Sequence, residues 1–317
     1  MFDFHLPIRS EGLVKAVVCS RYGPPEVLQL REVDPPVPKS HEVCIRIRAT
    51  AVTSSDCIVR SGRVYLRLWL PMRVVIGFRA PRKPLGMVLA GDVVSVGKDV
   101  ESFRPGDEVF GFDRFGFATY AQFKCISQRG LLTPKPSNVS YEEAAAIPYG
   151  GLLALYYLKR GGIRDGERVL IYGASGAVGT SAVQLARHFG ASVVGVCSTA
   201  NLDLVASLGA DAVLDYTKED FIERGDLYDL ILDAVPAAHR TARLEGKGGL
   251  TPSGKYVSVT SGSPAFHHEG LALLKELTEA GQLRPVIDRT YPLEQIVEAH
   301  RYVDTGHKKG NVVITVG

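Results

Sequence analysis

Three glycines spaced three residues apart, Gly173, Gly176 and Gly179, give this chain its clearest chemical signal. They follow the apolar segment 167–172 and lead into a segment, 177–189, whose apolar residues recur at helical spacing. Glycines in such a turn let backbone N–H groups approach a phosphate, and a helix N-terminus adds unpaired donors and a partial positive charge. A strand, a glycine-rich turn and a helix in this order predict a dinucleotide site, although the spacing G-x-x-G-x-x-G is one residue longer at its start than the usual fingerprint.

We assign the pyrophosphate to Gly173, Ser175, Gly176, Ala177, Val178 and Gly179. The alternative is a turn that only joins a strand to a helix.

The end of the next expected strand, 192–197, bears on the choice of nicotinamide cofactor. Sites that prefer NAD usually carry Asp or Glu there, bound to the ribose hydroxyls, whereas residues 192–202 contain no acid. A 2′-phosphate would therefore meet no repulsion from this segment, so we predict NADPH, with NADH as the alternative. Lys218 is the nearest cation in sequence. The groups that would donate hydrogen bonds to the phosphate are Ser198, Thr199, Asn201 and Tyr216, unless these hydroxyls only cap the following helix.

The elements that position these residues alternate between strand and helix from about residue 140. Expected strands at 167–172, 192–197, 212–216, 228–235 and 255–260 are separated by expected helices, including 177–189 and 202–208. This alternation predicts βαβ units and an α/β fold with a doubly wound parallel sheet. Residues 13–19, 42–49, 86–97 and 107–111 instead form short strand-like runs between turn residues, which is typical of a barrel or sandwich. A helix at 293–303 and a strand at 311–316 close the chain.

Composition excludes several classes of protein. The 317 residues are 45% hydrophobic, which is enough for a core, and 37 Lys+Arg against 34 Asp+Glu leave a net charge of +3. A nucleic-acid partner is therefore not expected, and we interpret the basic segment 62–84 as a solvated lid, with steering of an anionic substrate as the alternative. Five cysteines without a C-x-x-C pair favour reduced thiols. No apolar run reaches membrane-spanning length and no signal core is seen, so we expect a cytoplasmic protein without a membrane partner.

Several stretches together are typical of one superfamily. They are AVTSSDCIVRSG (51–62), GMVLAGDVVSVG (86–97), FRPGDEVFG (103–111), VLIYGASGAVGTSAVQLA (169–186) and LGADAVLDY (208–216). In these stretches the chain resembles the zinc-free quinone oxidoreductase branch of the medium-chain dehydrogenase/reductase superfamily. The resemblance implies a GroES-like β-barrel catalytic domain at 1–139, completed by 286–317, and a Rossmann domain at 140–285. It also implies a homodimer, and Val235, Ser261 and Asn311 complete the expected cofactor contacts.

The chain departs from the zinc-dependent members of that superfamily. Thr53 replaces the first zinc ligand, Gly86-Met87-Val88 stands where those members have Gly-His-Glu, and no cysteine-rich lobe follows Gly111. Thioether, valine and threonine side chains do not suit Zn²⁺, so we predict no metal. Without a Lewis acid, an electron-poor conjugated acceptor is easier to reduce than a simple carbonyl, because the resulting oxyanion needs only hydrogen-bond donors and a proton. The predicted reaction is NADPH-dependent reduction of a small quinone or α,β-unsaturated carbonyl.

Three residues are candidates for helping that reaction. Enoyl-reductase relatives use a Tyr some eight residues after the motif Asp; Tyr65 lies nine residues after Asp56, so the match requires an insertion. Tyr65 would donate a proton to the developing enolate, or else be an aromatic wall. Thr53 and Ser54 would bond the carboxamide, the ribose or the substrate oxygen.

Two other functions stay open at this stage. One is alcohol or aldehyde dehydrogenase chemistry, which many members of the superfamily perform. The other is a cofactor-binding protein without turnover, which is favoured by Leu153 and Ile58 in places where relatives commonly carry Thr and Tyr.

Overall fold

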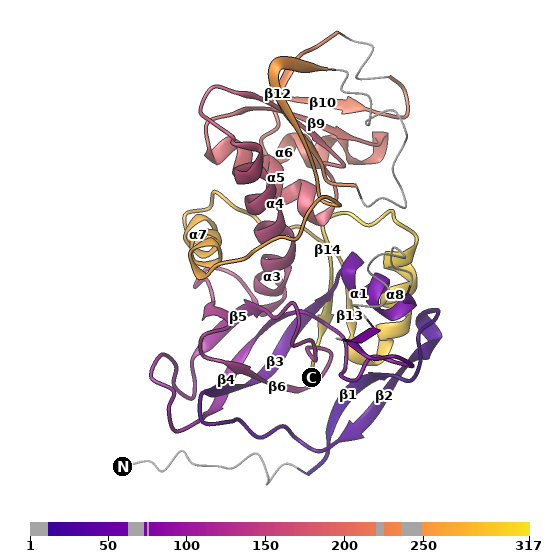
Figure 1. Ribbon diagram of the computed structural model, residues 1–317, viewed down its shortest axis with the longest axis vertical. Helices are drawn as coiled ribbons and strands as arrows, with labels where there is room; N and C mark the ends of the chain where they lie inside the picture. Colours follow the sequence, from indigo (N-terminus) through magenta and orange to yellow (C-terminus); the bar gives the residue numbers. More distant parts are fainter. Residues whose placement is uncertain (1–11, 63–72, 75, 220–224, 236–248) are drawn as a thin grey trace. The chain divides into compact units, whose positions relative to one another are not determined.

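The computed structural model describes residues 12–62, 73–74, 76–219, 225–235 and 249–317, so the predicted catalytic Tyr65 lies outside the described residues. The chain forms two compact units (Figure 1). Unit 1 contains Met1–Pro148 together with Ile287–Gly317, and unit 2 contains Tyr149–Val286. The C-terminal segment thus returns to the unit in which the chain begins.

Unit 2 contains a parallel sheet in the strand order β10-β9-β8-β11-β12. The chain starts at the central strand β8, adds β9 and β10 on one side, and then crosses over to add β11 and β12 on the other. All four pairs are parallel, so the doubly wound sheet predicted from the alternation is confirmed. The strands are β8 (Arg168–Tyr172), β9 (Ser192–Cys197), β10 (Ala212–Asp215), β11 (Tyr228–Asp233) and β12 (Leu250–Ser258). The helices are α4 (Pro148–Gly161), whose first residue belongs to unit 1, α5 (Ala177–His188), α6 (Leu202–Ser207) and α7 (His268–Glu279).

The central strands of unit 2 form because they are apolar along their whole length. Val169, Leu170 and Ile171 of β8 are fully buried. A parallel strand covered on both faces has no polar alternation, which is why β8 and β9 read as continuous apolar runs. Helices α5 and α6 pack against β8, β9 and β10.

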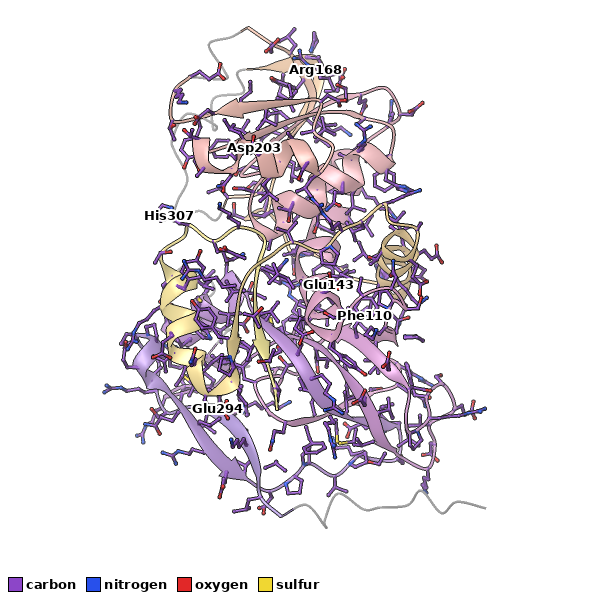
Figure 2. The ribbon with its side chains drawn as sticks, turned by 180° about the vertical axis from the view of Figure 1, so that it is seen from behind. Phe110, Glu143, Arg168, Asp203, Glu294 and His307 are labelled. Atoms are coloured by element: carbon purple, nitrogen blue, oxygen red, sulfur yellow. The ribbon has the colours of Figure 1, made fainter. Side chains whose placement is uncertain are left out.

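Unit 1 contains a second, larger sheet. Its main path is β13-β14-β3-β4-β5-β7, and β6 pairs with β3 beside that path. The last strand, β14, pairs antiparallel with β3, with Val313 opposite Ala51, so the C-terminal segment completes the sheet of the N-terminal one. Phe110 of β5, labelled in Figure 2, is fully buried. The strands are β3 (Glu42–Val52), β4 (Val88–Val96), β5 (Glu108–Phe112), β6 (Phe123–Ser127), β7 (Leu131–Pro134), β13 (Ile287–Pro292) and β14 (Asn311–Thr315), and β1 (Val14–Cys19) with β2 (Leu28–Val33) makes a separate antiparallel pair.

The helices of unit 1 are α1 (Ser54–Ser61), α3 (Tyr141–Ala146) and α8 (Ile296–Asp304). Helix α3 begins with a capping box in which the Ser140 side chain accepts from the Glu143 N–H and Glu143, labelled in Figure 2, accepts from the Ser140 N–H. Helix α1 has the same kind of start and packs against α8. The expected helix at 293–303 is a 3-10 turn, Leu293–Gln295, followed by α8. No helix in the described part of the chain is both long and apolar enough to span a bilayer.

Candidate functional site

The glycine turn after β8 is held tightly against the neighbouring strand. Gly173 has φ +77°, in the left-handed region that favours glycine. The N–H groups of Gly173 and Ala174 both donate to the carbonyl of Val196 at 3.0 Å, and the Gly176 N–H donates to the Gly173 carbonyl at 3.1 Å. The turn is therefore fixed by backbone bonds before any ligand is present.

Each of the three glycines meets a different steric limit. A Cβ on Gly173 would lie 2.7 Å from Val235 Cγ2, and a Cβ on Gly179 would lie 2.1 Å from the Gly173 carbonyl oxygen. At Gly176 the nearest atom to an added Cβ is the Gly173 oxygen at 3.6 Å, an ordinary contact. Gly173 thus permits the turn, Gly179 permits close packing of α5 on it, and Gly176 leaves open space at the start of α5.

Among the described residues, no side chain caps the N-terminus of α5. Gly176 occupies its N-cap position without a capping side chain, and the first turn carries no acid. The first N–H groups of a helix have no partners within the helix, and its N-terminus carries a partial positive charge. A backbone surface that combines the first N–H groups of a helix with positive potential fits a pyrophosphate. We call this surface, made by residues 173–179, the phosphate cradle.

Residues after β9 meet the phosphate cradle in space. The Asn201 Nδ2 donates to Ser175 Oγ at 3.1 Å and to Ser198 Oγ at 3.2 Å. Asn201 is 9% exposed, and its Oδ1 is buried without a partner in the described residues. The structure thus brings together Ser175, Ser198 and Asn201, which the sequence had assigned to two ends of one cofactor.

An acid that the sequence analysis did not consider lies in the same region. Asp215, at the end of β10, accepts a hydrogen bond from the Thr199 hydroxyl, and it also accepts from the Thr217 hydroxyl at 2.6 Å and the Thr217 N–H at 3.0 Å. The Thr199 and Thr217 side chains lower the pKa of Asp215 to about 2. Residues 192–202 contain no acid, but the neighbouring strand supplies one. The parallel register, with Asp215 opposite Cys197, brings this acid to the end of β9, and the sequence alone does not give that register.

The other predicted cofactor residues have varied surroundings. Tyr216 is 49% exposed, and its ring lies 6.3 Å from that of Tyr172. Val235 lies against Gly173, and the exposed Ser261 uses its carbonyl to accept from Tyr157 Oη at 3.1 Å. Asn311 is 6% exposed at the start of β14, in unit 1. Their contacts with a cofactor stay predictions.

In unit 1, Thr53 and Asp56 form a closed hydrogen-bonded pair. The Thr53 hydroxyl donates to Asp56 Oδ2 at 2.6 Å and accepts from the Asp56 N–H at 3.2 Å, while the Gly86 N–H donates to Asp56 Oδ1 at 3.1 Å. Asp56 is fully buried, and burial raises its pKa to about 6. The Thr53 proton is therefore committed to a cap. Ser54, the first residue of α1, is half-buried.

Beside α1 lies a buried histidine that the sequence did not single out. His300 of α8 is fully buried, and its Nδ1 lies 3.3 Å from Arg60 Nη1 and 3.4 Å from Cys57 Sγ. Arg60 also donates to Asp304 Oδ2 at 2.7 Å. Burial, with the Arg60 charge, lowers the pKa of His300 to about 3, so this imidazole is neutral.

The described residues do not offer zinc a set of ligands. No group of three or more His, Cys, Asp or Glu side chains in that part of the chain could hold a metal ion. Met87 and Val88 are buried as apolar side chains, at 3% and 0% exposed.

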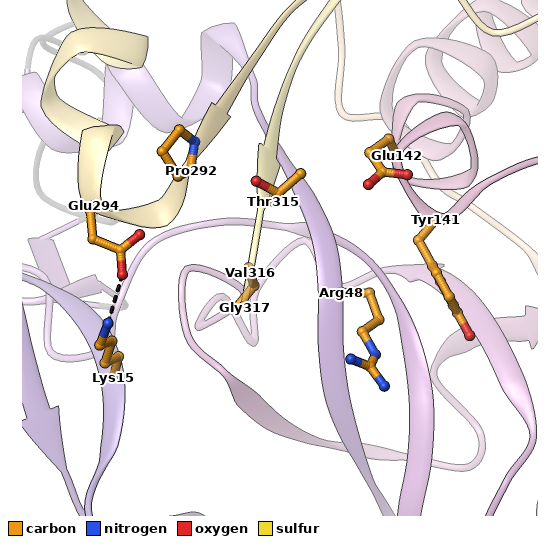
Figure 3. A pocket seen from close by; sticks show the side chains of 9 residues that line it. All are labelled: Lys15, Arg48, Tyr141, Glu142, Pro292, Glu294, Thr315, Val316 and Gly317. Atoms are coloured by element: carbon orange, nitrogen blue, oxygen red, sulfur yellow. Dashed lines mark hydrogen bonds and ion pairs between the residues drawn. The ribbon is translucent and has the colours of Figure 1, made fainter.

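A hollow of about 500 Å³ lies elsewhere in unit 1 (Figure 3). Lys15 and Glu294 form an ion pair at 2.7 Å on its wall. None of the residues that line it belongs to the predicted site, so we do not place the chemistry there. They are Lys15, Arg48, Tyr141, Glu142, Pro292, Glu294, Thr315, Val316 and Gly317.

Comparison with known proteins agrees with this architecture. Residues 39–153 match the family described as alcohol dehydrogenase GroES-like domain, and residues 251–314 match the family described as zinc-binding dehydrogenase. The chain is 34% identical to 2-methylene-furan-3-one reductase of Solanum lycopersicum, over 95% of this chain and 79% of that protein. It is 32% identical to the chloroplastic NADPH-dependent alkenal/one oxidoreductase of Arabidopsis thaliana, with the same shares. The solved structure of the quinone oxidoreductase from Coxiella burnetii superposes with a TM-score of 0.86 at 28% identity, covering 96% of this chain and 100% of that one.

The packing of Gly179 gives a prediction about stability. Gly179→Ala places a methyl group 2.1 Å from the Gly173 carbonyl oxygen, so α5 must move away from the turn. We expect the free energy of unfolding to fall by about 1–3 kcal/mol, measured by urea denaturation. Gly176→Ala, three residues earlier, is the matched control and should unfold like the wild type. Equal stability of both variants would contradict the assignment.

The buried imidazole gives a prediction about pH. His300 has a folded pKa of about 3 against an ordinary 6.5, so the unfolded state binds more protons as the pH falls below 6.5. Unfolding free energy should therefore drop by about 2 kcal/mol between pH 6.5 and pH 5 through this group alone. The raised pKa of Asp56 acts in the opposite direction, because its stability contribution is lost as the pH rises. The measurement is the difference between wild type and His300→Gln across this window, and parallel curves would show that His300 is not buried in the neutral form.

Proposed function

The chain belongs to the medium-chain dehydrogenase/reductase superfamily, and on that premise we propose that it reduces a quinone or an α,β-unsaturated carbonyl with NADPH. It is an oxidoreductase, with a GroES-like domain and a Rossmann domain. The observation that carries the proposal is the phosphate cradle, where Gly176 leaves open space at an uncapped helix N-terminus. Such a surface binds the pyrophosphate of a dinucleotide through backbone N–H groups.

The chain's own residues prepare the cofactor site. The cradle orients the pyrophosphate without needing to rearrange, because Gly173 and Ala174 are already bonded to Val196. Asn201 ties Ser175 to Ser198 and so keeps the turn after β8 and the turn after β9 in register. A bound nicotinamide supplies the hydride, and the protein supplies position and electrostatics.

Hydrogen bonding around β9 supports NADPH over NADH. Ser198 Oγ accepts from Asn201, which leaves its own proton for a ligand oxygen. The nearby Asp215 carboxylate is covered by donors from Thr199 and Thr217, and Lys218 Nζ lies 3.7 Å from it. A 2′-phosphate in this region would therefore face hydroxyl groups and a lysine that screen the acid. NADH would offer the Ser198 proton a neutral 2′-hydroxyl oxygen in place of a charged phosphate oxygen, and hydrogen bonds to charged acceptors are the stronger ones.

The class of substrate that accepts the hydride depends on the oxyanion that the protein can stabilise. Hydride addition to a conjugated carbonyl or a quinone leaves an oxyanion that needs hydrogen-bond donors and a proton. The Thr53 proton is committed to Asp56, so we assign the donor role to Ser54 and Tyr65. The relatives named for a furanone, for alkenals and enones, and for quinones support this substrate class.

Location and assembly belong to the proposal as well. We place the protein in the cytoplasm as a homodimer, on the sequence and the superfamily resemblance. The name of the Arabidopsis relative places that protein in chloroplasts, which is a different compartment from the one proposed for this chain.

The phosphate cradle predicts that one small substitution weakens NADPH binding without changing the stability of the fold. Gly176→Ala fills the open space at the start of α5 and should weaken NADPH binding by about tenfold or more, because the pyrophosphate can no longer approach the backbone. Its thermal midpoint should match that of the wild type. The measurement is NADPH affinity by fluorescence titration, followed by NADPH oxidation with a panel of quinones and enones.

Each alternative predicts a different result in that panel. Tight NADPH binding with no oxidation by any acceptor would identify a cofactor-binding protein without turnover. Activity on simple alcohols that is lost on chelation would favour alcohol or aldehyde dehydrogenase chemistry. Unchanged NADPH affinity in Gly176→Ala would show that the cradle does not hold the pyrophosphate.

Cofactor preference gives a second prediction. Ser198→Asp puts a negative charge where we place the 2′-phosphate, so kcat/KM should fall by about tenfold or more with NADPH and by less with NADH. Ser192→Asp, at the exposed start of β9, the strand that precedes Ser198, is the matched control and should leave both values unchanged. An equal loss with both cofactors would contradict the placement.

A further inference from the structure

Two cysteines face each other across neighbouring strands of unit 1. Cys44 of β3 and Cys125 of β6 are register partners, and the pairing is regular from Glu42 to Arg46. The strands meet antiparallel, with 80 residues of intervening chain between the two cysteines. The tertiary fold alone therefore makes this pair.

The hydrogen bonds on either side show whether Cys44 and Cys125 are a hydrogen-bonded or a non-hydrogen-bonded pair. The Gln128 N–H donates to the His41 carbonyl at 3.0 Å, and the Ile47 N–H donates to the Gln122 carbonyl at 2.8 Å. Hydrogen-bonded pairs alternate with non-hydrogen-bonded pairs along an antiparallel ladder. Odd positions of β3 are thus hydrogen-bonded to β6, and Cys44 with Cys125 is a non-hydrogen-bonded pair.

That geometry suits a disulfide. In a non-hydrogen-bonded pair the Cα atoms lie about 4.5 Å apart and the side chains are at their closest. Disulfides join cysteines whose Cα atoms are about 4.4–6.8 Å apart. The bond can therefore form with little movement of either strand.

The two thiols differ in access. Cys44 is fully buried, in contact with a small apolar cluster that includes Val14 and Phe123, whereas Cys125 is half-buried at the edge of that cluster. The Cys125 thiol beside it, together with burial, raises the pKa of Cys44 above its usual range. A small oxidant will therefore meet Cys125 first, with Cys44 placed behind it.

No other cysteine has such a partner. Cys19 pairs with Leu28, and its thiol donates to the Arg21 carbonyl at 3.0 Å. Cys57 lies beside His300, and Cys197 pairs with Asp215 in unit 2. Any intramolecular disulfide that respects the fold should therefore be selective for one pair.

We propose that Cys44 and Cys125 form a reversible dithiol/disulfide site that responds to peroxide. The Cys125 sulfur attacks one oxygen of hydrogen peroxide, and the O–O bond breaks. The Cys125 thiol becomes a sulfenic acid, and the other oxygen leaves as water. The Cys44 sulfur then attacks the Cys125 sulfur, the S–O bond breaks, and the hydroxyl leaves as a second water with the Cys44 proton. Two thiols are oxidised, one peroxide is reduced to two waters, and an added dithiol reverses the change.

The disulfide would join β3 to β6 by a covalent bond. It would close a loop that contains α1 and the Thr53–Asp56 cap, both of which follow directly from β3. Because a cross-link across a long loop restricts the unfolded chain, the oxidised protein should melt at a higher temperature than the reduced protein.

The test is peroxide treatment of the full chain followed by tryptic mapping without reduction. We expect peptide 40–46 to be linked to peptide 125–129, two free thiols to be lost, and the intact mass to fall by about 2 Da, all reversed by dithiothreitol. In Cys44→Ser the sulfenic acid on Cys125 should persist and react with dimedone. Cys19→Ser, whose hydroxyl can keep the bond to Arg21, is the matched control and should form the same link as the wild type.

Two results would overturn the proposal. One is a wild-type protein in which Cys125 is oxidised to a stable sulfenic or sulfinic acid while Cys44 stays a free thiol. The other is a disulfide pattern in which Cys44 or Cys125 is linked to Cys19, Cys57 or Cys197. Neither result depends on NADPH binding or turnover, so failure here is distinguishable from failure of the proposed reductase activity.

Discussion

The close approach of helix α5 to the turn after β8 is the constraint on which unit 2 depends. Gly179 packs where a single methyl group would lie 2.1 Å from the Gly173 carbonyl, and the same turn is bonded to Val196 of the next strand. This contact fixes the position of the α5 N-terminus relative to the sheet. It therefore fixes where the first N–H groups of α5, which have no partners within the helix, can meet a ligand.

In unit 1, buried polar groups hold helices α1 and α8 in place. Asp56 accepts hydrogen bonds from Thr53 and Gly86 in a fully buried position, so one carboxylate fixes the start of α1 and the approach of the chain before β4. Arg60 on the same helix bonds to Asp304 and lies beside His300 of α8. Partnered groups of this kind are costly to break, because loss of one partner leaves the other buried and unsatisfied.

The sequence determined the parts of this protein that depend on neighbouring residues. The apolar runs of β8 and β9 and the helical spacing of α5 predicted the parallel sheet, since a strand or helix imposes its own period on the chain. The three glycines that follow β8 predicted the phosphate cradle. A turn with positive φ and a close backbone approach both require a residue without a Cβ. Helix α1 was not predicted, although a buried capping box of Thr53 and Asp56 specifies its start.

Only the tertiary structure decided which distant residues became partners. Strand register placed Asp215 at Thr199, and it placed Cys125 opposite Cys44, although neither pair is close in sequence. Packing also gave the Thr53 hydroxyl a buried partner in Asp56, which the spacing of these residues alone does not reveal. Periodicity states which face of a strand is apolar but not which strand lies beside it, and that choice depends on the packing of the whole sheet.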